Sequence, residues 1–221
     1  MTTSAATKTH YNHTAWFYEQ MAGAYSMGKI KASKLAELEF IASGDRVLYP
    51  GAGGGEAAAA AAAEGAEVTC IDIAPAMLSR IQGKLDAGKL DAELIRGDIL
   101  EHDRVGYYDV VCANYFLNIF EDDLMRQIYA HLATLVKPGG LMMIADFAPA
   151  RGGPIARALH FVYYRMANAT FWLLTRTPLH PVYDYEGIGA DLGLEHKTTV
   201  FHRLFPGGPE YFQTLVLEKP S

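Results

Sequence analysis

Three glycines and one carboxylate are the first residues whose types and spacing could bind a ligand. Gly51, Gly53 and Gly55 alternate in the segment YPGAGGG, between an apolar run and an alanine-rich run. Glycine permits a tight turn and leaves no side chain to keep a ligand from the backbone. Asp72 closes the next apolar run, and its two oxygens could accept hydrogen bonds from both hydroxyls of a ribose. We therefore expect a nucleoside-containing ligand between the turn and Asp72.

Two further segments narrow the choice of ligand. GxGxxA can be read at Gly53, Gly55 and Ala58, so the glycines alone do not exclude NAD. In LIRGDIL, Asp98 follows a third apolar run, where a carboxylate could accept a hydrogen bond from an adenine amino group. The turn VKPGG, residues 136–140, precedes a fifth apolar run. These two segments discriminate between ligands better than the glycines do.

The elements that must position these residues alternate along the chain. Short β-branched runs alternate with helical patterns, which predicts a parallel sheet covered on both faces. We expect strands over 46–49, 68–72, 92–96, 109–113 and 141–147, and helices over 56–64, 76–85 and 122–136. Two helices are expected within 11–41. The segments 194–204 and 211–219, joined by FPGGP, predict an antiparallel hairpin at one edge of the sheet.

Five segments taken together resemble a known family. GAGGG, IDIAPAML, RGDIL, YDVVCANYFLNIF and LVKPGGLMMIADF are similar to class I S-adenosylmethionine (SAM)-dependent methyltransferases over residues 45–147. The N-terminal segment loosely resembles the lid of ubiquinone/menaquinone-biosynthesis-type small-molecule methyltransferases. The resemblance implies an α/β fold with a Rossmann-like, seven-stranded and mostly parallel sheet, a C-terminal antiparallel hairpin, helices on both faces and an N-terminal helical lid. It further implies one domain over 1–221, with a lid (1–44), a SAM-binding core (45–147), a substrate-side helical insertion (148–190) and the hairpin (191–221).

The same resemblance implies which residues bind SAM. The expected contacts are Gly51, Ala52, Gly53, Gly55, Asp72, Ile73, Met77, Asp98, Ile99, Asn114 and Tyr18. The glycine turn would line the amino acid and ribose of the cofactor, and Asp72 would bind the ribose. Ile73 and Met77 would flank the adenine, and Asp98 with Ile99 would hold its edge. Asn114 would lie under the methionine part. A lid tyrosine, at position 11, 18 or 25, would close over the cofactor.

One position departs from the family. Tyr49 stands two residues before the first glycine of the turn, where the family usually has an acidic residue. That carboxylate normally helps to fix the methionyl ammonium, so another group must take its place here. The candidates are the carbonyl of Gly51, Asn114, or a side chain from the N-terminal helices.

The segment from 151 to 185 reverses the local charge. No acidic residue lies between Asp146 and Asp184, while arginines and aromatic residues gather there. They are Arg151, Arg157, Arg165 and Arg176, with Phe161, Tyr163, Tyr164, Phe171 and Trp172. We expect this segment to form a large apolar acceptor pocket. The alternatives are a helix packed in the core or in a homodimer interface, and a peripheral contact of 151–180 with an anionic membrane.

The predicted activity is methyl transfer from SAM to a small or medium-sized, largely apolar or aromatic acceptor, quinol-like or lipid-like. If the acceptor is a hydroxyl, a base would assist, and we expect His160 in the acceptor wall or His13 in the lid. Tyr164 is expected to orient the acceptor. The histidine spacing gives no metal site. The alternatives are a SAM-fold enzyme with other chemistry and a non-catalytic SAM-binding interaction module.

Composition limits the class of protein. The chain has 221 residues, a formal net charge of −6, half of its residues hydrophobic and two cysteines. This describes a globular domain and disfavours nucleic acid as a partner, because nucleic-acid binders usually carry a basic face. The N-terminal sequence shows no apolar run typical of a secretory signal, and no segment is apolar for long enough to span a bilayer. We therefore expect a cytoplasmic protein.

Overall fold

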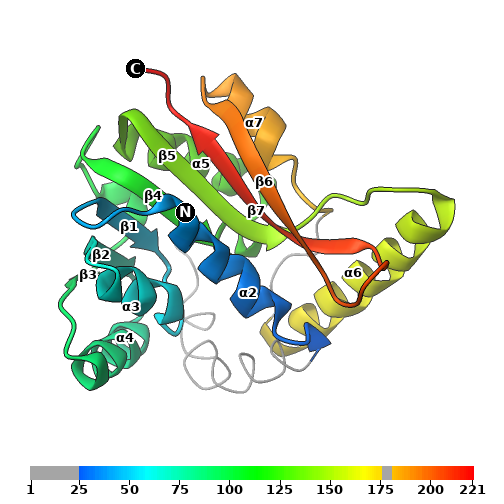
Figure 1. The fold of residues 1–221 in the computed structure, drawn as a ribbon, viewed down its shortest axis with the longest axis horizontal. Coiled ribbons are helices and arrows are strands. Elements are labelled where there is room, and N and C mark those ends of the chain that lie inside the picture. Colours follow the sequence, from blue (N-terminus) through cyan, green and yellow to red (C-terminus); the bar gives the residue numbers. More distant parts are fainter. Residues whose placement is uncertain (1–24, 176–180) are drawn as a thin grey trace.

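A single mixed sheet forms the centre of the computed structural model, which describes residues 25–175 and 181–221 (Figure 1). Its seven strands lie in the order β3-β2-β1-β4-β5-β7-β6. The strands are β1 (Arg46–Pro50), β2 (Glu67–Asp72), β3 (Glu93–Arg96), β4 (Tyr108–Asn114), β5 (Val136–Phe147), β6 (Glu195–Arg203) and β7 (Glu210–Glu218). The first five are parallel, and β7 runs antiparallel to both β5 and β6. The predicted mostly parallel, seven-stranded sheet with its C-terminal antiparallel hairpin is confirmed.

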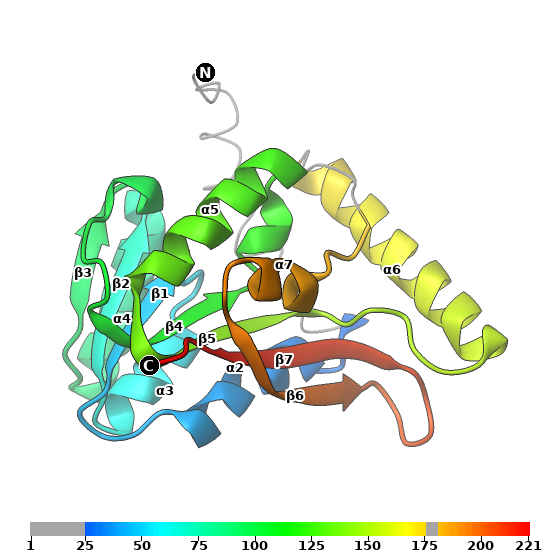
Figure 2. The ribbon, with the colours of Figure 1, turned by 90° about the horizontal axis from the view of Figure 1, so that it is seen from above.

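Helices cover both faces of this sheet (Figure 2). They are α2 (Lys29–Leu35), α3 (Glu56–Ala63), α4 (Pro75–Gly88), α5 (Asp122–Leu135), α6 (Pro154–Thr175) and α7 (Tyr185–Asp191), with the 3₁₀ helices η1 (Ala36–Phe40), η2 (Ile99–Glu101) and η3 (Leu117–Ile119). Strand side chains alternate between two cores. Leu48 and Val111 pack with α5 and α7, whereas Val47 and Val110 pack with α3 and α4.

The predicted elements agree with the structure to within three residues at their ends, apart from one strand. β5 begins at Val136 and so includes the VKPGG segment that we expected to precede it. Its pairing with β4 jumps from Tyr108 opposite Val136 to Val110 opposite Leu141. The segment is therefore a large bulge within the strand, and α5 ends at Leu135 as the proline-containing sequence requires.

The described part of the N-terminal segment is bonded to the sheet. The hydroxyl of Ser33 on α2 forms a 2.9 Å hydrogen bond with the hydroxyl of Tyr115. The backbone carbonyl of Ser33 accepts a 2.6 Å hydrogen bond from the hydroxyl of Thr214. Both Ser33 and Thr214 are fully buried. Residues 1–24, which include the greater part of the expected lid with His13 and Tyr18, lie outside the described residues.

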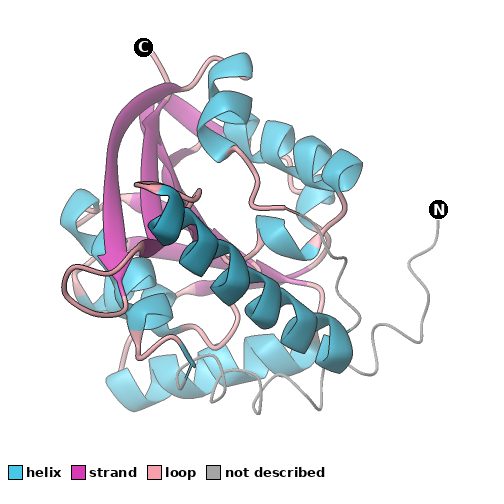
Figure 3. Ribbon diagram, turned by 90° about the vertical axis from the view of Figure 1, so that its right-hand side faces the viewer, coloured by secondary structure: helices cyan, strands magenta, loops and turns pink. Residues whose placement is uncertain are grey.

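The long helix α6 crosses the side of the molecule that faces the viewer in Figure 3. Its inner side chains Tyr164 and Ala167 pack on Phe147 and Phe212, which form a third and smaller core. In the described part of the chain, no helix is long and apolar enough to cross a membrane.

Candidate cofactor site

The glycine turn lies where the connections of the sheet change direction. β1 lies between β2 and β4, and the chain moves from β1 toward β3 before it returns to β4. In an open α/β sheet, this arrangement leaves a crevice outside the carboxyl ends of the two central strands, where ligands bind. The turn follows β1 directly and leads into α3, as its sequence predicted. The backbone N–H of Gly51 donates to the carbonyl of Ile71 at 2.8 Å, which holds the turn beside the end of β2.

The three alternating glycines are required for different reasons. All three adopt the left-handed conformation, with φ of 56°, 53° and 74° at Gly51, Gly53 and Gly55. A side chain at Gly51 would collide with the ring of Phe116, and one at Gly55 would come within 2.9 Å of Ile81 on α4. A side chain at Gly53 would meet nothing within 4 Å. Gly53 therefore leaves open space for a ligand, whereas the other two glycines permit close packing within the protein.

Asp72 ends β2 next to this turn and is half-buried. Its Oδ1 accepts a 2.8 Å hydrogen bond from the backbone N–H of Ala74. Among the described residues, its Oδ2 has no hydrogen-bond partner. Burial raises the pKa of the carboxyl, opposed by the hydrogen bond from Ala74. A half-buried carboxylate with one oxygen unused can accept hydrogen bonds from a polar ligand at this crevice.

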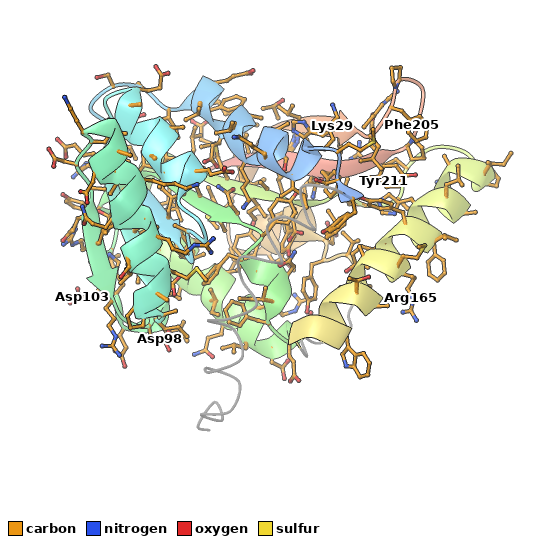
Figure 4. The ribbon with its side chains drawn as sticks, turned by 90° about the horizontal axis from the view of Figure 1, so that it is seen from below. Lys29, Asp98, Asp103, Arg165, Phe205 and Tyr211 are labelled. Carbon is orange, nitrogen blue, oxygen red and sulfur yellow. The ribbon has the colours of Figure 1, made fainter. Side chains whose placement is uncertain are left out.

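The residues expected around the adenine lie beyond Asp72. Ile73 is 56% exposed and offers a free apolar surface, whereas Met77 is only 4% exposed and belongs to the core. Asp98 is exposed near α4 (Figure 4), and its Oδ1 accepts from the backbone N–H of Leu100 as the cap of η2. Ile99 is buried beneath it. Asp98 thus has a structural bond, with its second oxygen left to act as an acceptor.

Asn114 ends β4 and is held by a buried acid that sequence reasoning missed. Its Nδ2 donates to both carboxylate oxygens of Glu37, at 3.2 and 3.0 Å. Glu37 is fully buried and also accepts from the hydroxyl of Tyr49 at 2.7 Å. The following residue, Tyr115, has a φ of 51°, which is unusual for a bulky side chain and turns the chain at the end of the strand. The unusual Tyr49 was the one indication in the sequence that an acid must come from elsewhere.

His160 and Tyr164 lie one turn apart on the inner side of α6. The His160 ring is 3% exposed and stacks on Tyr211, with ring centres 5.6 Å apart. Burial lowers its pKa, opposed by a hydrogen bond with the backbone of Ala148. In the described chain, its Nε2 is buried without a partner. Tyr164 contacts Phe147 edge-on, and burial raises its pKa. The lowered pKa favours the neutral ring that a base requires, and both catalytic roles stay predictions.

A narrow aromatic cleft near Tyr164 contains a second acid that sequence reasoning did not select. Its lining is Asn118, Asp146, Phe147, Tyr164, Val182, Tyr183 and Tyr185. Asp146, 2% exposed at the carboxyl end of β5, accepts from Asn118 and from Tyr185, each at 2.7 Å. Its position next to the last residue of the apolar run LMMIADF was the available signal for it. A larger hollow lies at the amino ends of β1–β3, around Arg46, Glu67 and Glu93, away from the glycine turn.

Comparison with known proteins agrees with this geometry. Residues 47–140 match the family of methyltransferase domains. This part of the chain is a class I SAM-dependent methyltransferase domain. A ubiquinone biosynthesis O-methyltransferase of Bordetella avium is 31% identical over 118 residues, which are 52% of this chain and 48% of that protein. The chain therefore matches about half the length of such relatives.

Solved structures share the fold at low sequence identity. Magnesium protoporphyrin IX methyltransferase from Synechocystis, solved with S-adenosylhomocysteine, gives a TM-score of 0.70 at 19% identity, covering 96% of this chain and 97% of its own. The 1,6-didemethyltoxoflavin-N1-methyltransferase of Burkholderia thailandensis gives 0.69 at 13% identity, covering 100% and 93%. The predicted family and fold are confirmed, while the residue assignments at the site rest on the geometry above.

Proposed function

We propose that this protein transfers the methyl group of SAM to a small or medium-sized, largely apolar or aromatic acceptor. The observation that carries the proposal is the meeting of three features at the carboxyl end of the sheet. These are the open turn at Gly53, the unused oxygen of Asp72 and the amide of Asn114, at the carboxyl ends of three adjacent strands.

The features fit the polar groups of SAM. Asp72 accepts from the ribose hydroxyls, and Gly53 lets the backbone approach the ligand because no side chain intervenes. Ile73 supplies exposed apolar surface for the adenine, to which Met77 adds only its 4% exposed edge, and the second oxygen of Asp98 accepts from the adenine amino group. The bound sulfonium supplies an activated methyl group, which is the chemistry of the cofactor. The protein contributes alignment, which can lower a barrier by about 7–11 kcal/mol.

The acceptor side supports an aromatic or quinol-like substrate. Four of the seven residues that line the narrow cleft are aromatic, and Asp146 with Asn118 places polar groups at its base. The cleft has no room for a water molecule in this structure, so a planar ring that carries a hydroxyl would enter it only if these side chains moved apart. The relatives named as ubiquinone biosynthesis O-methyltransferases favour the same acceptor class. We assign His160 as the base that assists a hydroxyl acceptor, with Tyr164 orienting it.

Contacts outside the site also belong to this proposal. The outer side of α6 carries exposed Ile155, Leu159, Val162 and Met166. Arg165 extends from the same helix into solvent (Figure 4). This surface supports a contact with a second copy of the chain or with an anionic membrane. We further propose a cytoplasmic location, in keeping with the two buried, unpaired cysteines.

The test is product analysis with purified protein. Methyl-labelled SAM is incubated with a catechol, a para-quinol or anionic phospholipid vesicles as acceptor. We expect S-adenosylhomocysteine to form in step with a methylated catechol or quinol, and not with vesicle lipid. Calorimetry with SAM in the absence of acceptor tests the cofactor separately. No heat at millimolar SAM would refute the proposal, and binding without any methylated product would favour other chemistry on the same fold.

A further inference from the structure

Glu37 is a fully buried acid on the short helix η1, which precedes β1 and the glycine turn. Burying a carboxylate is costly unless hydrogen bonds replace its water. Here Oε1 accepts from the Tyr49 hydroxyl at 2.7 Å, and both oxygens accept from Asn114 Nδ2. The acid is thus bonded to the ends of β1 and β4, the two strands that border the crevice.

These bonds decide which way the amide of Asn114 faces. An ionised carboxylate has no proton to donate, so it must be met by the NH₂ group of the amide. The carbonyl oxygen, Oδ1, is thereby turned away from Glu37. In the described residues this Oδ1 is buried and has no hydrogen-bond partner. A buried acceptor without a donor is unfavourable, which indicates that a donor arrives with a ligand.

The place of Asn114 indicates the chemistry of that donor. β1 and β4 pair in parallel with Val47 opposite Val110. Carried on by four residues, this register puts Gly51 opposite Asn114, so the amide stands beside the glycine turn. A carbonyl oxygen next to a buried negative charge favours a cationic N–H donor over a neutral one. The ammonium of the methionine part of SAM is such a group.

We propose that Glu37 is a positioning residue of the cofactor site, which holds Asn114 with its carbonyl oxygen toward the cofactor ammonium and supplies the negative charge that Tyr49 lacks. This rests on the proposed use of SAM. The acid of the site has in effect moved from β1 to η1, and Tyr49 has become a donor that anchors it.

The ionisation of Glu37 makes the arrangement sensitive to pH. Burial raises its pKa to about 7, opposed by hydrogen bonds from Tyr49, Asn114 and Cys112 and by the charge of Lys34. Tyr49 and Cys112 have pKa values raised well above their usual range, so both stay protonated. A protonated Glu37 can donate to the amide oxygen instead of accepting from the NH₂ group. Affinity for a ligand ammonium should therefore fall as the pH falls through about 7.

Calorimetry with S-adenosylhomocysteine and with 5′-methylthioadenosine tests this role, because the two ligands differ in the amino-acid part alone. For Glu37→Gln at pH 7.5 we expect S-adenosylhomocysteine to bind about tenfold more weakly and methylthioadenosine to change by less than about twofold. The control is Glu39→Gln, an exposed acid on the same 3₁₀ helix, which should change neither. The Glu37→Gln affinity should also lose its dependence on pH between 6 and 7.5.

Equal weakening of both ligands, or no weakening, would overturn the positioning role while leaving SAM binding intact. Failure of the unaltered protein to bind S-adenosylhomocysteine would overturn the proposed function itself. If Glu37→Gln does not fold, Tyr49→Phe gives a second test. Removing the Tyr49 hydroxyl takes away a hydrogen bond that lowers the pKa of Glu37. The midpoint of the pH dependence should then move upward, and an unchanged midpoint would refute the proposal.

Discussion

The η1 side of the crevice and the helix α6 differ in what they bury. On the η1 side, a carboxylate, a phenol and an amide lie under the sheet end with hydrogen bonds between them. On α6, large apolar side chains such as Ile155 and Met166 are 79% and 67% exposed, while His160 is 3% exposed. Polar groups buried at a cost define the chemistry of a ligand closely. Exposed apolar groups indicate that another surface covers them, but they do not indicate the chemistry of that surface.

Glycine substitutions should separate packing from ligand access within the first region. Gly51→Ala places a side chain against the Phe116 ring in a left-handed conformation, and we expect a loss of about 2–4 kcal/mol in the free energy of unfolding. Gly53→Ala has the same backbone conformation but open space, so its loss should be about 1–2 kcal/mol. Urea unfolding measures both. Equal losses would contradict the assignment of different roles to the two glycines.

The buried acid predicts a pH dependence of stability. A carboxyl whose pKa is raised by folding binds its proton more tightly in the folded state, so its contribution is largest at low pH and is lost as the pH rises. For Glu37 the loss runs from about pH 4.5 to about 7 and amounts to about 3 kcal/mol. As the pH rises from 5 to 8, the free energy of unfolding of the original protein should therefore fall relative to that of Glu37→Gln. Parallel pH profiles of the free energy of unfolding for the two proteins would show that folding does not raise the pKa of Glu37.

The ribose assignment depends on Asp72. Asp72→Asn keeps an oxygen for the backbone N–H of Ala74 and replaces the second acceptor by a donor. We expect affinity for SAM to fall by roughly 1.5–3 kcal/mol, about ten- to a hundred-fold, with little change in stability. The control is Asp103→Asn, an exposed acid in the loop after η2 that is not among the proposed cofactor contacts (Figure 4). An unchanged dissociation constant for SAM in folded Asp72→Asn would show that this carboxylate does not bind the ribose.

The first region was partly predictable because its signals are local. The strand, the glycine turn, α3, β2 and Asp72 occupy one continuous stretch, and alternating apolar runs with glycines between them define it. Glu37 was not predictable as a site residue, because its partner Asn114 is 77 residues away and AELEF reads as an ordinary short helix. Asp146 was likewise visible only as an acid next to the last residue of an apolar strand. Its partner Tyr185 lies 39 residues further along, on α7.

The second region resisted prediction for a different reason. α6 carries apolar residues around most of its circumference, so the sequence does not indicate which side faces the sheet. The structure buries His160, Tyr164 and Ala167 and leaves Leu159 and Val162 exposed. A histidine inside and a leucine outside reverse the usual preference. The choice is made by the aromatic residues Phe147, Tyr211 and Phe212 on β5 and β7, which distant parts of the chain supply.

The smallest effect on stability is expected on the outer side of α6. The double substitution Leu159→Ser and Val162→Ser should change the free energy of unfolding by less than about 0.5 kcal/mol, because both side chains are exposed. Tyr164→Ser on the inner side should cost about 3–5 kcal/mol. Sedimentation and flotation with anionic vesicles then show what covers the exposed side. Loss of a dimer indicates a second copy, loss of vesicle binding indicates a membrane, and a stability loss as large as that of Tyr164→Ser would mean that this side is buried within the protein itself.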